Sequence, residues 1–139
     1  MSAPPPFSPT IVLLTVSRRY EADFAAALKP LGLTTRKYGL LGHIRATPDI
    51  SFSELARRSR ITVQSVHAAV RAFTEAGWVD DGTAHAGAAA RLRVTRDGEE
   101  LLAAVAAEVA RLDEEFTRQN PELADALRAH MRRMGSPFA

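Results

Sequence analysis

Cysteine is absent from the 139 residues of the chain. Its absence excludes disulfides, thiol redox sensing and cysteine ligands to a metal ion. The four histidines and the carboxylates repeat no metal-ligand spacing, so we interpret His43 and His130 as structural histidines. The sequence therefore predicts no metal site.

Long apolar runs are missing as well. A membrane-spanning helix needs about 20 predominantly apolar residues in succession, and the sequence has no such run. The first residues, MSAPPPFSP, are rich in proline and have no basic side chain, whereas a secretory signal begins with basic residues. These two absences predict a cytoplasmic protein without a membrane partner.

Catalytic motifs are also lacking. The sequence has no glycine-rich phosphate loop, no serine turn of the hydrolase type and no carboxylate pair spaced for acid and base catalysis. The acidic cluster at 113–115 lies where a helix face is expected. The sequence therefore predicts no enzyme, no catalytic residue and no cofactor.

Lysine is scarce, because only Lys29 and Lys37 among the 18 basic residues are lysine, and the net charge is only +2. The arginines are unevenly placed along the chain. Between Glu54 and Arg71 there are four arginines and a single acidic residue. Such local clustering, more than a high total charge, is typical of a nucleic-acid-binding surface.

The stretch from residue 53 to residue 94 has the pattern of a winged helix-turn-helix. A short helix, which Ser53 can cap, is followed by an arginine-rich turn and by Thr62, a favourable cap for a second helix. Gly77 is placed to end that helix, because glycine readily adopts the left-handed conformation there. The helical spacing of apolar residues predicts a buried stripe of Val63, Val66, Val70 and Phe73.

The opposite face of the second helix is polar or small, and its members are Gln64, His67, Ala68, Arg71 and Glu75. Such side chains reach base edges and phosphates when the helix lies in a major groove. Two short strands follow, from Trp78 and from Arg91. Strand alternation places Leu92 and Val94 toward the core and Arg93 outward.

Further helices are predicted on both sides. Ser8 and Pro9 suit the start of a helix that ends near Leu28, and another helix runs from Thr34 or Thr35 to about Arg45. A long helix from 96 to about 118 has an apolar stripe of Leu101, Val105, Val109, Leu112 and Phe116. A winged domain does not need these helices for its own core, so their apolar faces predict a second copy of the chain as partner.

The ordered set of motifs resembles the MarR (multiple-antibiotic-resistance regulator) family of dimeric winged helix-turn-helix repressors. The matching segments are LGLT at 31–34, SELARR at 53–58, EAGWV at 75–79 and VTRDGEELL at 94–102, where Thr95 is the expected cap and Gly98 lies in the first turn. The resemblance implies a mainly α-helical fold with a small β-wing. One domain over 9–134 would hold the winged helix-turn-helix at 34–94, between dimerisation helices at 9–29 and 96–134, with a disordered tail at 1–8 and a second tail at 135–139.

The resemblance also implies a function. Proteins of this kind are transcription regulators, usually repressors, that bind a pseudo-palindromic operator in double-stranded DNA as homodimers, and a small aromatic ligand often releases them. The candidate DNA contacts are Arg57, Arg58, Arg60, Thr62, Gln64, Ser65, His67, Ala68, Arg71, Arg91 and Arg93. The candidate ligand contacts are Arg19, Tyr38, His43 and Arg45.

Two departures from the family pattern keep an alternative open. The family usually has glycine in the helix-turn-helix turn, where this chain has Arg60, and a left-handed backbone there costs a non-glycine residue about 1 kcal/mol. The family wing usually carries an aspartate and an arginine, where this chain has Ala86, Gly87 and Ala88, with His85 as the only other candidate cation. The alternative is a winged-helix protein-interaction module that has lost specific DNA binding.

Overall fold

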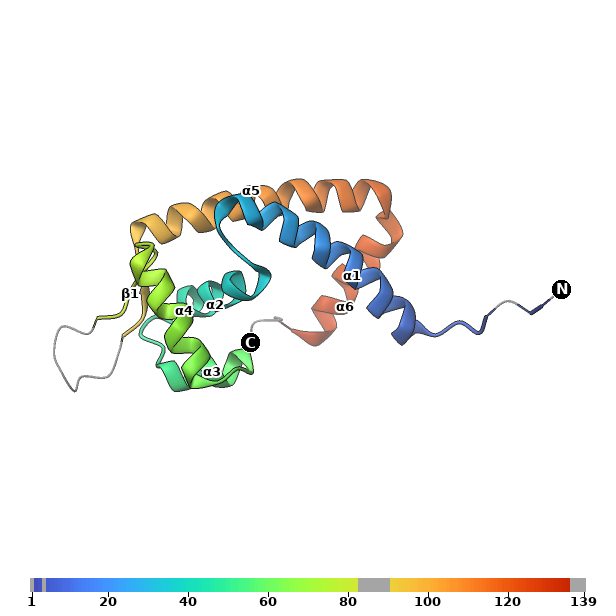
Figure 1. Cartoon of the computed structure of the whole chain (residues 1–139). Helices are drawn as coiled ribbons and strands as arrows, with labels where there is room; N and C mark the ends of the chain where they lie inside the picture. The colour runs from blue at the N-terminus through green and yellow to red at the C-terminus, as the bar shows by residue number, and fades with distance from the viewer. Residues whose placement is uncertain (1, 4, 83–90, 136–139) are drawn as a thin grey trace. The chain divides into compact units, whose positions relative to one another are not determined.

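The computed structural model describes residues 2–3, 5–82 and 91–135. In chain order its elements are α1 (Pro9–Leu28), the 3-10 helix η1 (Lys29–Leu31), α2 (Thr35–Ala46), α3 (Phe52–Ser59), α4 (Val63–Glu75), β1 (Val79–Asp80), β2 (Arg93–Val94), α5 (Arg96–Gln119) and α6 (Pro121–Met134) (Figure 1). This order confirms the predicted mainly α-helical fold with a small wing.

Contacts group the chain into two compact units, Met1–Ala104 and Val105–Ala139. The first unit holds all elements from α1 to the first part of α5, and the second holds the rest of α5 and α6. The single domain over 9–134 stays a prediction. The wing-tip positions His85, Ala86, Gly87 and Ala88 lie outside the described residues.

Hydroxyl side chains start three helices of the first unit where the sequence predicts them. Ser8 caps α1, Thr34 caps α2 and Thr62 caps α4, because each side-chain oxygen accepts a bond from a backbone N–H three residues further along the chain. Each cap satisfies a donor that has no partner within the helix. The starts of these helices are therefore encoded locally.

The N-cap residue of α3 is Ser51, whereas the sequence predicts Ser53. The side chain of Ser51 takes this position, and its Oγ accepts from the backbone N–H of Glu54 at 3.1 Å. The helix therefore begins at Phe52, whose ring meets that of His67 on α4 edge-on, with centroids 4.3 Å apart. Either serine suits a cap by residue type, so residue type alone does not choose between them.

The core of the first unit is aliphatic apart from Phe73, and no polar or charged residue is buried as a whole among the described residues. Trp78, at the base of the wing, is half-buried beside Phe73. The buried residues of this unit are Leu28, Leu33, Leu40, Leu41, Ile44, Ile50, Leu55, Ala56, Val66, Val70, Phe73, Val79, Leu92 and Leu102.

Val63 departs from the predicted stripe of α4. It is 41% exposed, whereas Val66, Val70 and Phe73 are buried. Side chains on a helix lean toward its N-terminus, so the side chain of this first helical residue leans past the start of the helix and beyond the packed core.

The base of the wing is a two-stranded antiparallel sheet. Val79 pairs with Val94 and Asp80 with Arg93, while an isolated bridge joins Ile50 to Leu92. The predicted alternation is confirmed, because Leu92 is buried and Val94 half-buried, whereas Arg93 is exposed. Beyond the strands the N–H of Arg91 donates to the carbonyl of Asp81 at 2.9 Å, which closes the hairpin at its base.

The end of α4 and the start of α5 are joined by a compact junction. Gly77 follows α4 at φ 80°, and its carbonyl accepts from the hydroxyl of Thr95 at 2.5 Å. The same hydroxyl oxygen accepts from the N–H of Gly98 at 3.1 Å, and the N–H of Thr95 donates to the carbonyl of Trp78 at 2.9 Å. Thr95 is thus the cap that the sequence predicts.

In the second unit Val105 is fully buried. The other members of the predicted α5 stripe are half-buried, and in the first unit Leu102 rather than Leu101 takes the buried place. Asn120 holds the N-cap position of α6, but its side chain donates back to the carbonyl of Phe116 at 3.3 Å instead of capping the helix.

Each unit has a helix with exposed apolar side chains. On α1 the side chains of Ile11, Val12, Leu13 and Leu14 are 46–62% exposed, and on α6 those of Leu123, Leu127, Met131 and Met134 are 40–69% exposed. The α6 residues recur at spacings of four, four and three, which puts them on one side of the helix. In the described part of the chain, no helix is both long and apolar enough to cross a membrane.

Candidate nucleic-acid interface

The turn between α3 and α4 is made by Arg60 in a left-handed conformation, with φ 55° and ψ 43°. The N–H groups of Arg60 and Ile61 both bond back to carbonyls in the last turn of α3, at 3.3 Å to Arg57 and 3.1 Å to Ala56. These bonds end α3 where a glycine usually stands. The positive φ considered for this position is therefore present, and the side chain of Arg60 is exposed.

The outer face of α4 is exposed as predicted, at Gln64, His67, Ala68, Arg71 and Glu75. This face follows directly from the burial of the opposite stripe against α3, which fixes how the helix is rotated. It presents an amide and a guanidinium, the two groups that read adenine and guanine edges best.

Thr62 and Ser65 have a structural role at the start of α4. The hydroxyl of Thr62 donates to Oγ of Ser65 at 2.9 Å, and its oxygen accepts from the Ser65 N–H at 3.0 Å. These bonds keep both side chains at the helix terminus, where N–H groups favour an anion.

Glu54 on α3 holds two of the candidate arginines. Its carboxylate accepts from Nε of Arg57 at 2.9 Å, from a second nitrogen of the same guanidinium, and from Nε of Arg58 at 2.8 Å. Arg58 also donates from Nη1 to Oγ1 of Thr47, the residue directly after α2, at 2.8 Å. Hydrogen bonds from Arg57, and next from Arg58, lower the pKa of Glu54 to about 2, so its carboxylate is ionised at neutral pH.

Arg93 is held by a residue far away in the sequence. Its Nε and Nη2 donate to the two carboxylate oxygens of Asp49 at 3.0 and 2.9 Å. Asp49 stands at φ 65°, and its own N–H donates to the carbonyl of Leu92 at 3.1 Å. The hydrogen bonds with Arg93 lower the pKa of the Asp49 carboxyl, and the pair ties the segment before α3 to the wing.

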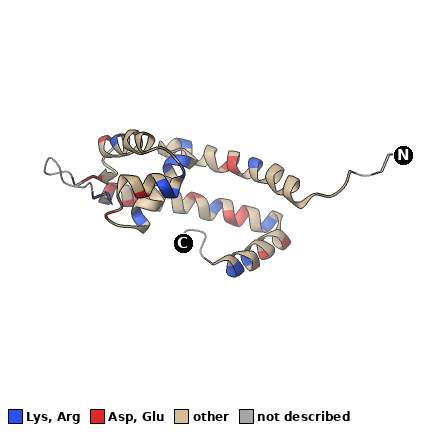
Figure 2. Cartoon of the chain, turned by 90° about the horizontal axis from the view of Figure 1, so that it is seen from below, with Lys and Arg blue, Asp and Glu red and all other residues tan. Residues whose placement is uncertain are grey.

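Among the described residues, Arg60, Arg71 and Arg91 are the exposed candidate arginines that form no ion pair with a described carboxylate. Figure 2 shows how acidic and basic residues are interspersed along the helices. The candidate arginines therefore differ in how available they are, which their sequence positions do not reveal.

The four candidate ligand residues do not gather in one described pocket. The ring of Tyr38 packs on Phe24 of α1 with centroids 5.4 Å apart, and the guanidinium of Arg19 lies 5.8 Å from the ring of Tyr20. His43 is half-buried on α2. Of the four, Arg45 is the one that lines a described pocket.

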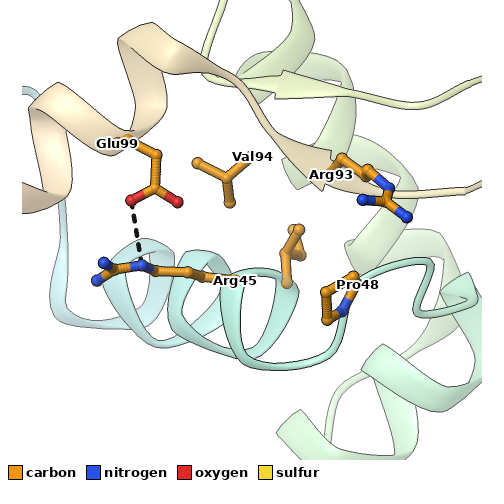
Figure 3. Close-up of a pocket in the computed structure, with 6 residues that line it drawn as sticks. Arg45, Pro48, Arg93, Val94 and Glu99 are labelled. Atoms are coloured by element: carbon orange, nitrogen blue, oxygen red, sulfur yellow. Dashed lines mark ion pairs between the residues drawn. The ribbon is translucent and has the colours of Figure 1, made fainter.

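This pocket is open, measures about 160 Å³ and is lined by Ile44, Arg45, Pro48, Arg93, Val94 and Glu99. Nε of Arg45 and Oε2 of Glu99 are 3.1 Å apart across it, and Figure 3 shows Arg93 extending away from that pair. The charged side chains that line the pocket form ion pairs within the protein, Arg45 with Glu99 and Arg93 with Asp49. No group of three or more metal-ligating side chains occurs in the part of the chain that the structure describes.

Sequence reasoning missed Glu54, Asp49 and Thr47 as partners of the arginines. The spacing of Glu54 from Arg57 and Arg58, three and four residues on one helix, is a signal that could have found the first pair. Asp49 and Arg93 are 44 residues apart, and no local pattern joins them.

The comparisons with known proteins agree with this geometry. A model of the MarR family matches residues 31–87, which include α2, α3, α4 and β1. The chain is similar over this part to winged-helix proteins of the MarR family. It is 34% identical over 68 residues to the HTH-type transcriptional repressor Rv2887 of Mycobacterium tuberculosis, an alignment that covers 49% of each protein. The chain thus spans about half the length of the curated relatives it matches.

Solved structures extend the likeness of the chain in fold to nearly its whole length. Rv2887 of M. tuberculosis in complex with DNA has a TM-score of 0.76 at 24% identity, covering 94% of this chain and 100% of that one. Rv2887 in complex with salicylic acid has a TM-score of 0.67 at 25% identity, with coverage of 94% and 98%. MepR, the regulator of a Staphylococcus aureus multidrug efflux pump, has the same fold at 15% identity, with a TM-score of 0.76 and coverage of 92% and 96%.

Proposed function

We propose that the chain is a cytoplasmic transcription regulator, a repressor, that binds a pseudo-palindromic operator in double-stranded DNA as a homodimer. The observation that carries the proposal is the exposed face of α4 with Gln64, His67 and Arg71, held outward by the helix-turn-helix packing. The MarR fold and a relative described as a repressor support it. In a related structure a protein of this fold is in complex with DNA.

The proposed contacts have different roles. The exposed face of α4 reads base edges, because the major groove of DNA admits an α-helix. The residues on this face are Gln64, His67, Ala68 and Arg71. Arg60 and Arg91 contact phosphates, since both are exposed and form no described ion pair. Arg57, Arg58, Arg93, Thr62 and Ser65 remain candidate backbone contacts that are engaged within the protein.

Selection of binding sites from a random duplex library tests the DNA-binding proposal. We expect enrichment of a pseudo-palindrome with half-sites about 10 base pairs apart, centre to centre. Gln64→Ala should lose the preference at one or two base pairs, at a cost of about 1–3 kcal/mol per lost contact. Arg60→Ala should instead weaken binding to all sequences alike and lower the salt slope by about one. No enrichment from the library would refute the proposal.

The proposal of a homodimer rests on the exposed apolar side chains at the start of α1 and on the apolar stripe of α6. Leu127→Asp would place a charge in the α6 stripe and should shift the protein from dimer to monomer in sedimentation equilibrium. Ala129→Asp, also exposed, lies across the helix from the stripe and should leave the dimer intact. A monomeric unsubstituted protein would exclude the dimer.

A small aromatic acid is the proposed effector. A related MarR protein has been solved with salicylic acid, and the pocket beside Arg45 combines a guanidinium with apolar Ile44 and Val94. Salicylate should raise the melting temperature of the protein and weaken its binding to DNA. Arg45→Ala should abolish the melting shift, whereas Arg96→Ala, an exposed arginine on α5, should preserve it.

A second candidate function is a protein-interaction module without specific DNA binding. The observation in its favour is that Arg57, Arg58 and Arg93 already have carboxylate partners within the chain. This candidate predicts weak binding to any duplex, without preference, and unchanged cellular function in an Arg57→Ala, Arg58→Ala double variant.

A further inference from the structure

The carboxylate of Glu54 occupies the donors that a DNA phosphate would use. It is bound by two nitrogens of the Arg57 guanidinium, the side-by-side geometry with which arginine also binds phosphate. The side chain of Arg57 is 71% exposed, so a phosphate could approach it. Glu54 is 33% exposed and belongs to the same short helix, so it faces the same solvent.

Arg58 differs from Arg57 in one respect. Its guanidinium bonds both Glu54 and the hydroxyl of Thr47, and its side chain is 36% exposed. It therefore ties the end of α2 to α3 as well as pairing with Glu54. Arg57 has no such second partner among the described residues. Its guanidinium can therefore exchange the carboxylate of Glu54 for a phosphate of DNA.

We propose that Glu54 is an internal competitor for DNA phosphate that limits the affinity of the α3 end for duplexes of every sequence. The proposal rests on the DNA-binding function proposed above and adds a residue that works against binding. A phosphate that binds Arg57 must displace the carboxylate or share the guanidinium with it. In either case part of the electrostatic gain is lost, because the ionised Glu54 stays close to the DNA.

Glu54→Gln removes the competing charge and keeps a residue that suits this helix position. Glutamine, like glutamate, is favoured three residues after a serine cap, so α3 is retained. The matched control is Glu100→Gln, which changes the net charge equally but removes an exposed partner of Arg96 on α5. Circular dichroism melting of both variants establishes that they are folded.

Fluorescence anisotropy with a random-sequence duplex and with the selected operator, over a series of salt concentrations, measures the effect. Glu54→Gln should bind both duplexes about three- to tenfold more tightly, the range for releasing one or two exposed ion pairs. Its salt slope should steepen by about one, because one more phosphate is neutralised. In the Glu54→Gln background, Arg57→Gln should cost more affinity than it does alone.

The outcomes separate the two proposals. If the unsubstituted chain binds no duplex at low salt, the DNA-binding function fails. If it binds and Glu54→Gln behaves like Glu100→Gln, only the role of Glu54 is overturned. Should Glu54→Gln not fold, the NMR signal of the Arg57 Nε–H decides in the unsubstituted protein. It should move when duplex is added, and an unmoved signal overturns the inference.

Discussion

Alanine at Gly98 should destabilise the protein, whereas alanine at Gly39 should stabilise it. Both glycines lie within helices, Gly39 in α2 and Gly98 in the first turn of α5. Helix propensity alone favours alanine at both positions, by about 0.5–1 kcal/mol each. Gly39 is exposed and Gly98 is buried, so the two positions differ sharply in what a new methyl group would meet.

At Gly39 a Cβ would meet nothing within 4 Å, so the propensity gain should appear in full. At Gly98 it would lie 2.2 Å from the carbonyl oxygen of Trp78 and 2.6 Å from Cγ1 of Val94, where ordinary contact begins at 3.4 Å. The carbonyl would have to retreat by about 1 Å, which costs about 1–3 kcal/mol as overpacking. Its hydrogen bond from Thr95 would weaken, for a further 0.5–1.5 kcal/mol or so.

After the propensity gain is subtracted, Gly98→Ala should lower the free energy of unfolding by about 1–4 kcal/mol. Urea denaturation followed by circular dichroism at 222 nm measures both variants against the unsubstituted chain. An unchanged denaturant slope would show that the midpoints report stability. Midpoints that moved in the same direction for Gly39→Ala and Gly98→Ala would refute the steric reasoning.

Three further outcomes follow from the described contacts. Arg60→Gly should raise the free energy of unfolding by about 1 kcal/mol in urea titrations, because glycine relieves the left-handed backbone, while anisotropy shows weaker binding to every duplex. Thr95→Val should lower the free energy of unfolding by about 1–3 kcal/mol, because both hydrogen bonds of the hydroxyl are lost. Thr117→Val, at an exposed position of α5, should change this free energy little. Because the pKa of Glu54 falls from 4.5 to about 2 on folding, its pairing contributes stability above pH 4.5 that is lost as the pH falls toward 2. Urea titrations at several pH values should show the unsubstituted chain and Glu54→Gln converging across that interval.

Local signals were enough to predict most of the fold. The caps Ser8, Thr34 and Thr62, and Gly77 after α4, each act within a few residues, so the sequence around them determines the helix ends. The cap of α3 was missed because two serines flank Phe52 and both suit a cap by residue type, whereas the structure has Ser51 in this position.

The charged contacts of the site were harder to predict. The guanidinium of Arg93 meets Asp49 only after the wing folds back, and no periodicity joins positions so far apart. Exposure of Arg60 and burial of Leu92 follow from helix and strand patterns, but the pairing of each arginine depends on side-chain positions in space. The sequence therefore identified the cluster of arginines. It did not show which of them form ion pairs with carboxylates of the chain and which do not.

The bonds at the base of the wing make its outer segment exchangeable. Val79 pairs with Val94, and the Arg91 N–H bonds the carbonyl of Asp81, so both ends of the hairpin are held by contacts that do not involve the tip. The entropic cost of joining two fixed ends rises slowly with the length of the connection, by about 0.6 kcal/mol for each doubling. We therefore expect that residues 83–90 can be replaced by sequences of other lengths and charges, including ones that contain arginine. The contacts at the base of the wing and the packing of α4 should be retained in such variants.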